Sequence, residues 1–257
     1  MILCCHITFF YIIDRIKYIN RIIDEINKYE IKTDIFLHTN KEDLTIEHFN
    51  TFTNGNLNII WHDLTNIVHP YYLTWSCRPI LHNQKDLYDY FMYIEDDILV
   101  PYNAIKYWLK HSNDLIKLNY NLGFVRIETL NNIEYITDLY NEQLDTIINI
   151  NDNIYCINNK NPYCAFWIYT KEEFNNFINS NFYQCYTIMG YGIREKSAIG
   201  LHGIQTDYYK ATIIPIVNNK LDLDCRIYHM PNNYVIDNTN GFATIKFDEA
   251  IKKFPFV

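Results

Sequence analysis

Three consecutive carboxylates, Glu95, Asp96 and Asp97, end an otherwise apolar stretch, YFMYIEDDILVP, which covers residues 90–101. Like charges at this spacing repel one another, and their removal from water is costly unless a cation compensates them. Hard divalent cations such as Mg²⁺ and Mn²⁺ prefer oxygen ligands, often only one or two from protein, with substrate phosphates supplying others. The run therefore predicts a divalent-metal site. A solvated acidic turn, with Asp97 capping the next helix, explains the three residues alone equally well.

The elements around this run alternate between strand and helix. Strands are predicted at 2–10, 32–40, 57–63 and 88–97, and helices at 14–29, 42–52, 72–84 and 101–116. This alternation predicts an α/β fold with a mixed, mainly parallel central sheet flanked by helices. Asp14 is expected to cap the first helix, and Pro79 to interrupt the third.

The carboxyl ends of parallel strands are where ligands bind in such sheets. Asn40, Asp63 and the carboxylate run all fall at predicted strand carboxyl ends. If the fourth strand continues through the run, Glu95 and Asp97 share one face of the sheet and Asp96 points to the other.

The second half of the chain is less regular. Strands are predicted at 122–130, 133–137, 164–169 and 211–217, with a hairpin turn at Asn131-Asn132, and helices at 171–180 and 247–254. No repeat and no Ser/Gly/Pro-rich linker is visible. A single domain over 1–257 is therefore expected, with a first half 1–110 and a second half 111–257.

Composition narrows the classes of partner. A net charge of -8 and a pI of about 5.5 argue against non-specific nucleic-acid binding.

Seven cysteines at irregular spacing predict reduced, mostly buried thiols and a cytoplasmic protein. The apolar start, MILCCHITFFYII, is too short to span a membrane and predicts a core strand. Abundant Ile, Asn, Tyr and Lys are typical of an A/T-rich genome, such as that of a giant virus or some protists.

The segment MYIEDDILVPYNAIKYW resembles the metal-binding segment of GT-A glycosyltransferases, in which a D-x-D or E-D-D motif follows an apolar strand. The similarity is greatest to the N-acetylglucosaminyltransferases that act on N-glycans and O-mannose. The resemblance implies a nucleotide-sugar donor, a glycan or glycoprotein acceptor and bound Mn²⁺ or Mg²⁺. It makes Asp97 the metal ligand and places Glu95 and Asp96 beside the ribose and the donor sugar.

Further residues follow from chain order within the same resemblance. Asn40 stands where the family has an acid that contacts uracil, a departure that leaves the base open. Thr74 and Arg78 stand in the helix that carries basic groups toward the nucleotide, and a guanidinium matches phosphate geometry. A solvent-facing arginine on the surface is the alternative for Arg78. Asp63, at a strand end, completes the expected nucleotide-sugar site. The first half of the chain is thus the expected nucleotide-sugar-binding half, and the second the acceptor half.

The acceptor side supplies the expected general base. Glu195 lies in the glycine-flanked segment GYGIREKSAIG, where the family keeps a carboxylate that takes the acceptor's proton. Asp207 and Glu128 are the fallback choices for this base in the present sequence. His229, in RIYHMPNNY, corresponds to a C-terminal histidine that binds the metal in many GT-A enzymes.

The sequence thus predicts a metal-dependent glycosyltransferase that uses a nucleotide sugar, a UDP-sugar by preference, with an inverting outcome implied by the resemblance. Two rivals remain. A Mg²⁺-dependent nucleotidyltransferase also uses paired acids, but it usually needs a glycine-rich loop near the first strand, and CCHITFFYIID has no glycine. A non-catalytic sugar-binding protein on the same fold is the other.

Overall fold

The computed structural model describes the chain apart from residues 185–189, 202–209, 238, 240 and 253–257. Contacts divide it into two units, Met1–Tyr102 with Ala165–Gly200, and Asn103–Cys164 with Leu201–Val257. The single domain over 1–257 with halves 1–110 and 111–257 stays a prediction. The return of the segment after Ala165 to the first unit was not expected from chain order. Asp207, one fallback base, lies outside the described residues.

The first unit is built on a sheet with strand order β11-β4-β1-β2-β3. The strands of the first unit are β1 (Ile2–Phe9), β2 (Lys32–Thr39), β3 (Leu57–Trp61), β4 (Tyr90–Glu95), β5 (Ile98–Leu99) and β11 (Phe166–Thr170). Its α-helices are α1 (Ile16–Ile26), α2 (Arg78–Gln84), α4 (Lys171–Ile178) and α5 (Ile193–Ser197). Its 3-10 turns are Ile13–Arg15, Ile46–His48, Pro70–Trp75 and Asn181–Tyr183.

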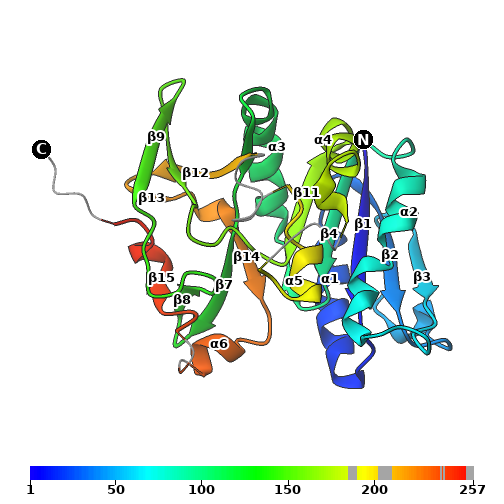
Figure 1. Cartoon of the computed structure of the whole chain (residues 1–257). Helices are drawn as coiled ribbons and strands as arrows, with labels where there is room; N and C mark the ends of the chain where they lie inside the picture. Colours follow the sequence, from blue (N-terminus) through cyan, green and yellow to red (C-terminus); the bar gives the residue numbers. More distant parts are fainter. Residues whose placement is uncertain (185–189, 202–209, 238, 240, 253–257) are drawn as a thin grey trace, which may run out of the picture. The chain divides into compact units, whose positions relative to one another are not determined.

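Four strands of this sheet run parallel, and β11 is antiparallel to β4 (Figure 1). The predicted α/β fold with a mixed, mainly parallel sheet and flanking helices is therefore confirmed. The pairing register sets Thr8 beside Glu95, Phe9 beside Thr39, and Thr39 beside Trp61. The carboxyl ends of β1 to β4 thus lie at one edge of the sheet.

Burial explains why these segments form these elements. Every residue of β1 from Leu3 to Phe9 is buried, as expected of an interior parallel strand covered on both faces. On α1, the isoleucines at three- and four-residue spacing form the buried stripe, namely Ile19, Ile22, Ile23 and Ile26.

Three local predictions need correction. Arg15, not Asp14, occupies the N-cap of α1, because a 3-10 turn precedes that helix. The helix expected over 42–52 is only the turn Ile46–His48. Pro79 does not interrupt a helix but lies in the first turn of α2, where its missing N–H has no partner to lose.

The second unit holds the remaining elements. Its strands are β6 (Tyr120–Leu122), β7 (Val125–Leu130), β8 (Ile133–Ile136), β9 (Thr146–Ile150), β10 (Asn153–Ile157), β12 (Ala211–Val217), β13 (Lys220–Leu221), β14 (Arg226–His229) and β15 (Ile245–Lys246). Its helices are α3 (Tyr102–Lys117) and α6 (Asn233–Ile236), with 3-10 turns at Leu223–Cys225 and Phe247–Glu249. Strands β13, β12, β10 and β9 follow in that order with β6 beside β12, and β15, β8, β7 and β14 lie in another sheet.

The predicted hairpin at Asn131-Asn132 is confirmed. Strands β7 and β8 pair antiparallel up to Leu130 and Ile133. Asn131 and Asn132 have φ of 52° and 62°, the left-handed conformation that a two-residue hairpin turn requires and that asparagine tolerates.

The cysteines match their expected chemistry. Within the described part of the chain, Cys4, Cys5, Cys77, Cys156, Cys164 and Cys225 are buried and form no disulfide.

Among the helices of the described residues, none has the length and hydropathy needed to cross a bilayer.

A chain of hydrogen-bonded histidines crosses the first sheet. His6 Nδ1 lies 2.8 Å from His38 Nε2, and His38 Nδ1 lies 2.8 Å from His62 Nε2. Gln84 Oε1 lies 2.9 Å from His6 Nε2 and accepts the last hydrogen bond of the chain. Neutral His6 and His38 therefore each donate one bond and accept one, and His62 donates to His38. Burial lowers the pKa of all three imidazoles, that of His6 to about 3.

This histidine chain predicts acid lability. The unfolded chain takes up protons near pH 6.5, whereas folded His6 stays neutral down to about pH 3, so falling pH favours unfolding in that window. His6→Leu should be less stable than the wild type at pH 7.5. As the pH falls, however, its free energy of unfolding should decrease less steeply than that of the wild type, by up to about 1.4 kcal/mol less per pH unit. Urea unfolding from pH 7.5 to 4.5 measures this. The exposed His82→Gln is the control, and equal slopes for His6→Leu and the wild type would refute the assignment.

Candidate functional site

The carboxylate run lies at the carboxyl end of β4, an interior strand between β1 and β11. Glu95, Asp96 and Asp97 are 5%, 7% and 7% exposed, so the solvated acidic turn considered above does not describe them. Strand β4 ends at Glu95 and a turn begins there. The alternation of faces expected for a continuing strand therefore does not extend to Asp96 and Asp97.

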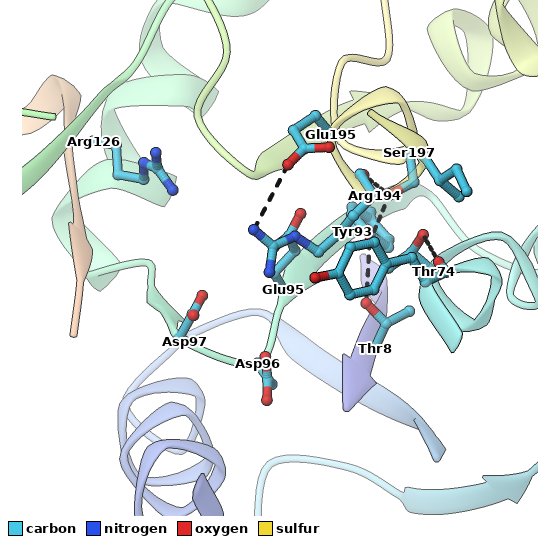
Figure 2. A network of polar contacts seen from close by, with 12 residues as sticks. Thr8, Thr74, Tyr93, Glu95, Asp96, Asp97, Arg126, Arg194, Glu195 and Ser197 are labelled. Atoms are coloured by element: carbon cyan, nitrogen blue, oxygen red, sulfur yellow. Dashed lines mark hydrogen bonds and ion pairs between the residues drawn. The ribbon is translucent and has the colours of Figure 1, made fainter. Parts of the chain in front are cut away.

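Two arginines compensate these buried charges. Arg15 Nη2 lies 2.7 Å from Asp96 Oδ1 and 2.6 Å from Asp97 Oδ2. Arg194 Nε lies 3.5 Å from Glu95 Oε2 (Figure 2). Burial and then the neighbouring Asp97 charge raise the pKa of Asp96 well above its usual range, although Arg15 opposes this shift. The site is therefore held together by charge pairing between segments that lie far apart in the chain.

A pocket of about 390 Å³ opens beside these groups, within the first unit. Its lining combines charged, polar and apolar side chains: Thr8, Phe10, Ile12, Arg15, Pro70, Tyr71, Leu73, Thr74, Glu95, Asp96 and Arg194. Phe10, Ile12 and Tyr71 are 43%, 48% and 49% exposed, so apolar surface remains available to a ligand. Such a mixture of apolar walls with a few convergent polar groups is typical of small-molecule sites.

Helix α5 reaches this pocket through Arg194 and is anchored by Ser197. The fully buried Ser197 carbonyl accepts hydrogen bonds from Arg78 Nη2 at 2.8 Å and Trp167 Nε1 at 3.2 Å. Its hydroxyl donates to the Arg194 carbonyl and lies 3.0 Å from the Tyr93 hydroxyl, which in turn lies 3.0 Å from Thr8 Oγ1 (Figure 2). These bonds join β1, β4 and α5.

Glu195 is presented by this anchored helix. Its side chain is 37% exposed and lies 3.7 Å from Arg194 Nη2 (Figure 2). Because Arg194 also contacts Glu95, one guanidinium connects the expected base to the end of β4. At the end of the segment, Gly200 has φ of 61°, and an added Cβ there would collide with Tyr169.

Arg78 does not have the surroundings of a phosphate clamp. Its guanidinium is buried and lies within 5.6 Å of the ring centroids of Trp75, Trp167, Phe177 and Tyr183. Nε and Nη1 have no hydrogen-bond partner among the described residues, so the aromatic faces solvate the charge. This cage favours a packing role.

Thr74, Asn40 and Asp63 each accept or donate one hydrogen bond that involves a backbone group. Thr74 lines the pocket, and its hydroxyl donates to the Tyr71 carbonyl at 2.8 Å. Asn40 Oδ1 accepts from the Tyr11 N–H at 2.8 Å. Asp63 Oδ1 accepts from the Thr65 N–H at 2.9 Å, and this bond lowers the pKa of Asp63. Asn40 and Asp63 thus follow β2 and β3 as expected, and their roles toward a ligand stay predictions.

His229 lies in the second unit, at the end of β14, together with the fallback base Glu128. His229 is buried, its Nδ1 bonds to Glu128 Oε1, and Glu128 Oε2 accepts from the Val235 N–H at 2.7 Å. A carboxylate that fixes an imidazole in this way is the usual outer-shell partner of a metal-binding histidine. Glu128 is therefore engaged with His229, and its partners favour a positioning role.

The donor set partly fits a hard divalent cation. Asp96 and Asp97 direct one oxygen each to a common point, and Asp96 Oδ2 is buried with no hydrogen-bond partner in the described part of the chain. Two carboxylates suit Mg²⁺ or Mn²⁺ when substrate phosphates supply further ligands. Among the described residues, no group of three or more His, Cys, Asp or Glu side chains is arranged to hold a metal.

Sequence reasoning missed Arg15 and Arg194. Both line the pocket, and both pair with the carboxylate run. The available signal was the run itself, since three buried carboxylates require cations. Arg15 follows the first strand and Arg194 immediately precedes the expected base, but neither position singles it out from other arginines in the chain.

Comparison with known proteins adds little. No protein-family model matches the chain, and no curated protein matches it. Among solved structures, it is similar to "Crystal structure of S. aureus TarS 1-349", with a TM-score of 0.43 and 9% identity. That alignment covers 92% of this chain, which spans 63% of the length of the TarS chain. A likeness at this level carries no argument about function.

The aromatic cage generates a prediction. Arg78→Met keeps the aliphatic stem but removes the charge and the donor to Ser197, so it should lower the free energy of unfolding by about 2–4 kcal/mol. Arg21→Met, at an exposed position on α1, is the control. Urea unfolding measures the difference. Unchanged stability together with lost nucleotide affinity would instead restore the phosphate-clamp role expected from the sequence.

Proposed function

We propose that this protein is a divalent-metal-dependent glycosyltransferase that moves a sugar from a nucleotide-diphosphate donor, a UDP-sugar by preference, to a hydroxyl of a glycan or glycoprotein. The observation that carries the proposal is the pocket at the carboxyl edge of the parallel sheet, where a buried carboxylate pair, two arginines and an apolar wall converge. The likeness of the E-D-D segment to GT-A enzymes supports the same assignment.

Each part of this pocket suits one part of such a donor. Arg15 and Arg194 carry the positive charge that a diphosphate requires. Phe10, Ile12 and Tyr71 offer apolar and aromatic surface to a base and ribose. Glu95 and Asp96 can accept hydrogen bonds from ribose or sugar hydroxyls. A volume of about 390 Å³ lies within the range of small-molecule sites.

The metal would be held by Asp97 with Asp96 beside it, and when bound it neutralises charge on the leaving diphosphate. His229 keeps its proposed role as a ligand, supported by its bond to Glu128. In the transfer, the acceptor oxygen bonds to the anomeric carbon and the bond from that carbon to the phosphate oxygen breaks. The nucleoside diphosphate leaves with the electron pair, and Glu195 takes the hydroxyl proton, an inverting course.

One experiment tests the whole proposal: the protein is titrated with nucleotide sugars, with and without Mn²⁺, and both binding and hydrolysis of the nucleotide sugar are measured. Metal-dependent binding with slow release of nucleoside diphosphate is expected. Release of pyrophosphate from nucleoside triphosphates would identify a nucleotidyltransferase instead. Metal-independent sugar binding with no turnover would identify a non-catalytic binding protein.

Asp97→Asn should abolish the Mn²⁺ dependence of donor binding, because an amide is a much poorer ligand for a hard cation than a carboxylate. Asp96→Asn should weaken donor binding less. Calorimetric titration of UDP-sugars into each variant, with Asp43→Asn on the exposed surface as the control, measures both effects. If Asp97→Asn binds the donor with the same Mn²⁺ dependence as the wild type, Asp97 is not a metal ligand.

Glu195→Gln should lower kcat by about 10²- to 10⁴-fold, the usual contribution of a positioned base, and leave the donor Kd nearly unchanged. Steady-state transfer rates and equilibrium donor titration are measured on the same preparation. Glu172→Gln, exposed on α4, is the control. Transfer within a fewfold of the wild type would move the role to Asp207, and a large loss of donor affinity would make Glu195 a sugar contact.

A further inference from the structure

Arg15 binds both aspartates through a single atom. Its Nη2 lies 2.7 Å from Asp96 Oδ1 and 2.6 Å from Asp97 Oδ2, and both carboxylate side chains are only about one-tenth exposed. Two carboxylate oxygens from adjacent residues thus converge on one positively charged nitrogen. Oxygens that bind Mg²⁺ or Ca²⁺ lie about 2.0–2.6 Å from the ion. Nη2 therefore occupies a point that a small divalent cation could occupy after slight adjustment of the same two oxygens.

Arg15 leaves part of this arrangement unsatisfied. Asp96 Oδ2 is buried and lacks a hydrogen-bond partner among the residues that the structure describes, and so does Arg15 Nε. An ion with two positive charges would match the carboxylates better than the arginine does.

Arg15 also has room to leave. Its side chain is 27% exposed and lines the 390 Å³ pocket, and it extends from the N-cap of α1 and not from the sheet itself. Moving the guanidinium would therefore leave the strands undisturbed. It would also keep the positive charge at the pocket, where a phosphate group can bind it.

We propose that Arg15 is an internal counter-ion that competes with the divalent cation for Asp96 and Asp97, so that metal binding displaces its guanidinium and Arg15 sets the metal affinity. This inference rests on the metal dependence proposed above. The opposite arrangement is a permanent structural ion pair, in which Arg15 holds both aspartates in every state of the protein and removing it weakens whatever the aspartates bind.

Direct binding of Mn²⁺ alone separates the two arrangements. Free Mn²⁺ is counted by its electron paramagnetic resonance signal in titrations of wild type, Arg15→Met and Arg21→Met, the last a control on the exposed side of α1. Arg15→Met should bind Mn²⁺ at least about tenfold more tightly than wild type, because an adjacent Arg⁺ lowers the pKa of an aspartate by about 1–3 units and repels a metal cation by the same charge. Arg21→Met should match the wild type. Equal or weaker binding by Arg15→Met would overturn the proposal.

Arg15→Met removes the guanidinium that Asp96 and Asp97 share and is expected to be less stable. Thermal unfolding with and without Mn²⁺ therefore accompanies the titration, and the Mn²⁺-induced rise in Tm should be larger for Arg15→Met than for wild type. Arg15→Lys retains the charge on a shorter side chain that cannot bridge both oxygens as closely. It should fold and bind Mn²⁺ more tightly than wild type, and equal affinity would contradict competition.

Two further measurements keep this inference distinct from the proposed function. The gain in Mn²⁺ affinity should vanish in Arg15→Met/Asp97→Asn, since the ligand is then absent. If a gain persists there, the metal binds elsewhere and the competition is refuted. Sugar transfer by the wild type in Mn²⁺ and in EDTA tests the glycosyltransferase assignment by itself. If the wild type transfers sugar in EDTA and Arg15→Met binds Mn²⁺ no more tightly than the wild type, the protein is still a glycosyltransferase, but Arg15 does not compete with the metal.

Discussion

The compensation of buried carboxylates at the end of β4 is the interaction on which the site depends. Three acidic side chains with 5–7% exposure cannot stay ionised there without nearby positive charge. The chain provides it from Arg15, 81 and 82 residues before the aspartates it binds, and from Arg194, which contacts Glu95. These ion pairs tie the start of α1 and the start of α5 to the same strand end, and the pocket lies among them.

The anchoring of α5 shows how the rest of the first unit supports this pairing. Helix α5 has only five residues, too few to be stable on its own propensity. Ser197 holds it through bonds to Arg78, Trp167 and Tyr93, so its position is set by tertiary contacts. The arginines of this unit therefore have two different environments. Arg15 and Arg194 are partly exposed and face carboxylates at the pocket, whereas Arg78 is buried and its charge is solvated by aromatic rings. Arg15 and Arg194 are thus accessible to a ligand, and Arg78 is not.

Two pairs of buried charged or titratable groups lie within the second unit. Arg126 binds Asp138 through two contacts, of 2.6 and 3.0 Å, and Glu128 joins His229 to the Val235 N–H. Such fully paired groups are costly to break singly, because the partner would remain buried and uncompensated. The orientation of the His229 ring is therefore fixed within this unit, which is the condition for an imidazole to serve as a dependable ligand or proton carrier.

The sequence by itself determined the layout of the first sheet, since alternating strands and helices, a fully apolar first strand and the isoleucine spacing of α1 are local signals. It also determined that polar strand ends gather at one edge, but it left open whether Glu95, Asp96 and Asp97 form a solvated turn or need a cation, and their burial in the fold decided this. Only the tertiary structure decided which cations are present, because Arg15 and Arg194 approach the carboxylates through folding over long separations in the chain. The return of Ala165–Gly200 to the first unit, the burial of Arg78 in an aromatic cage and the bond between Glu128 and His229 depend on contacts between distant segments. Local residue patterns do not encode such contacts.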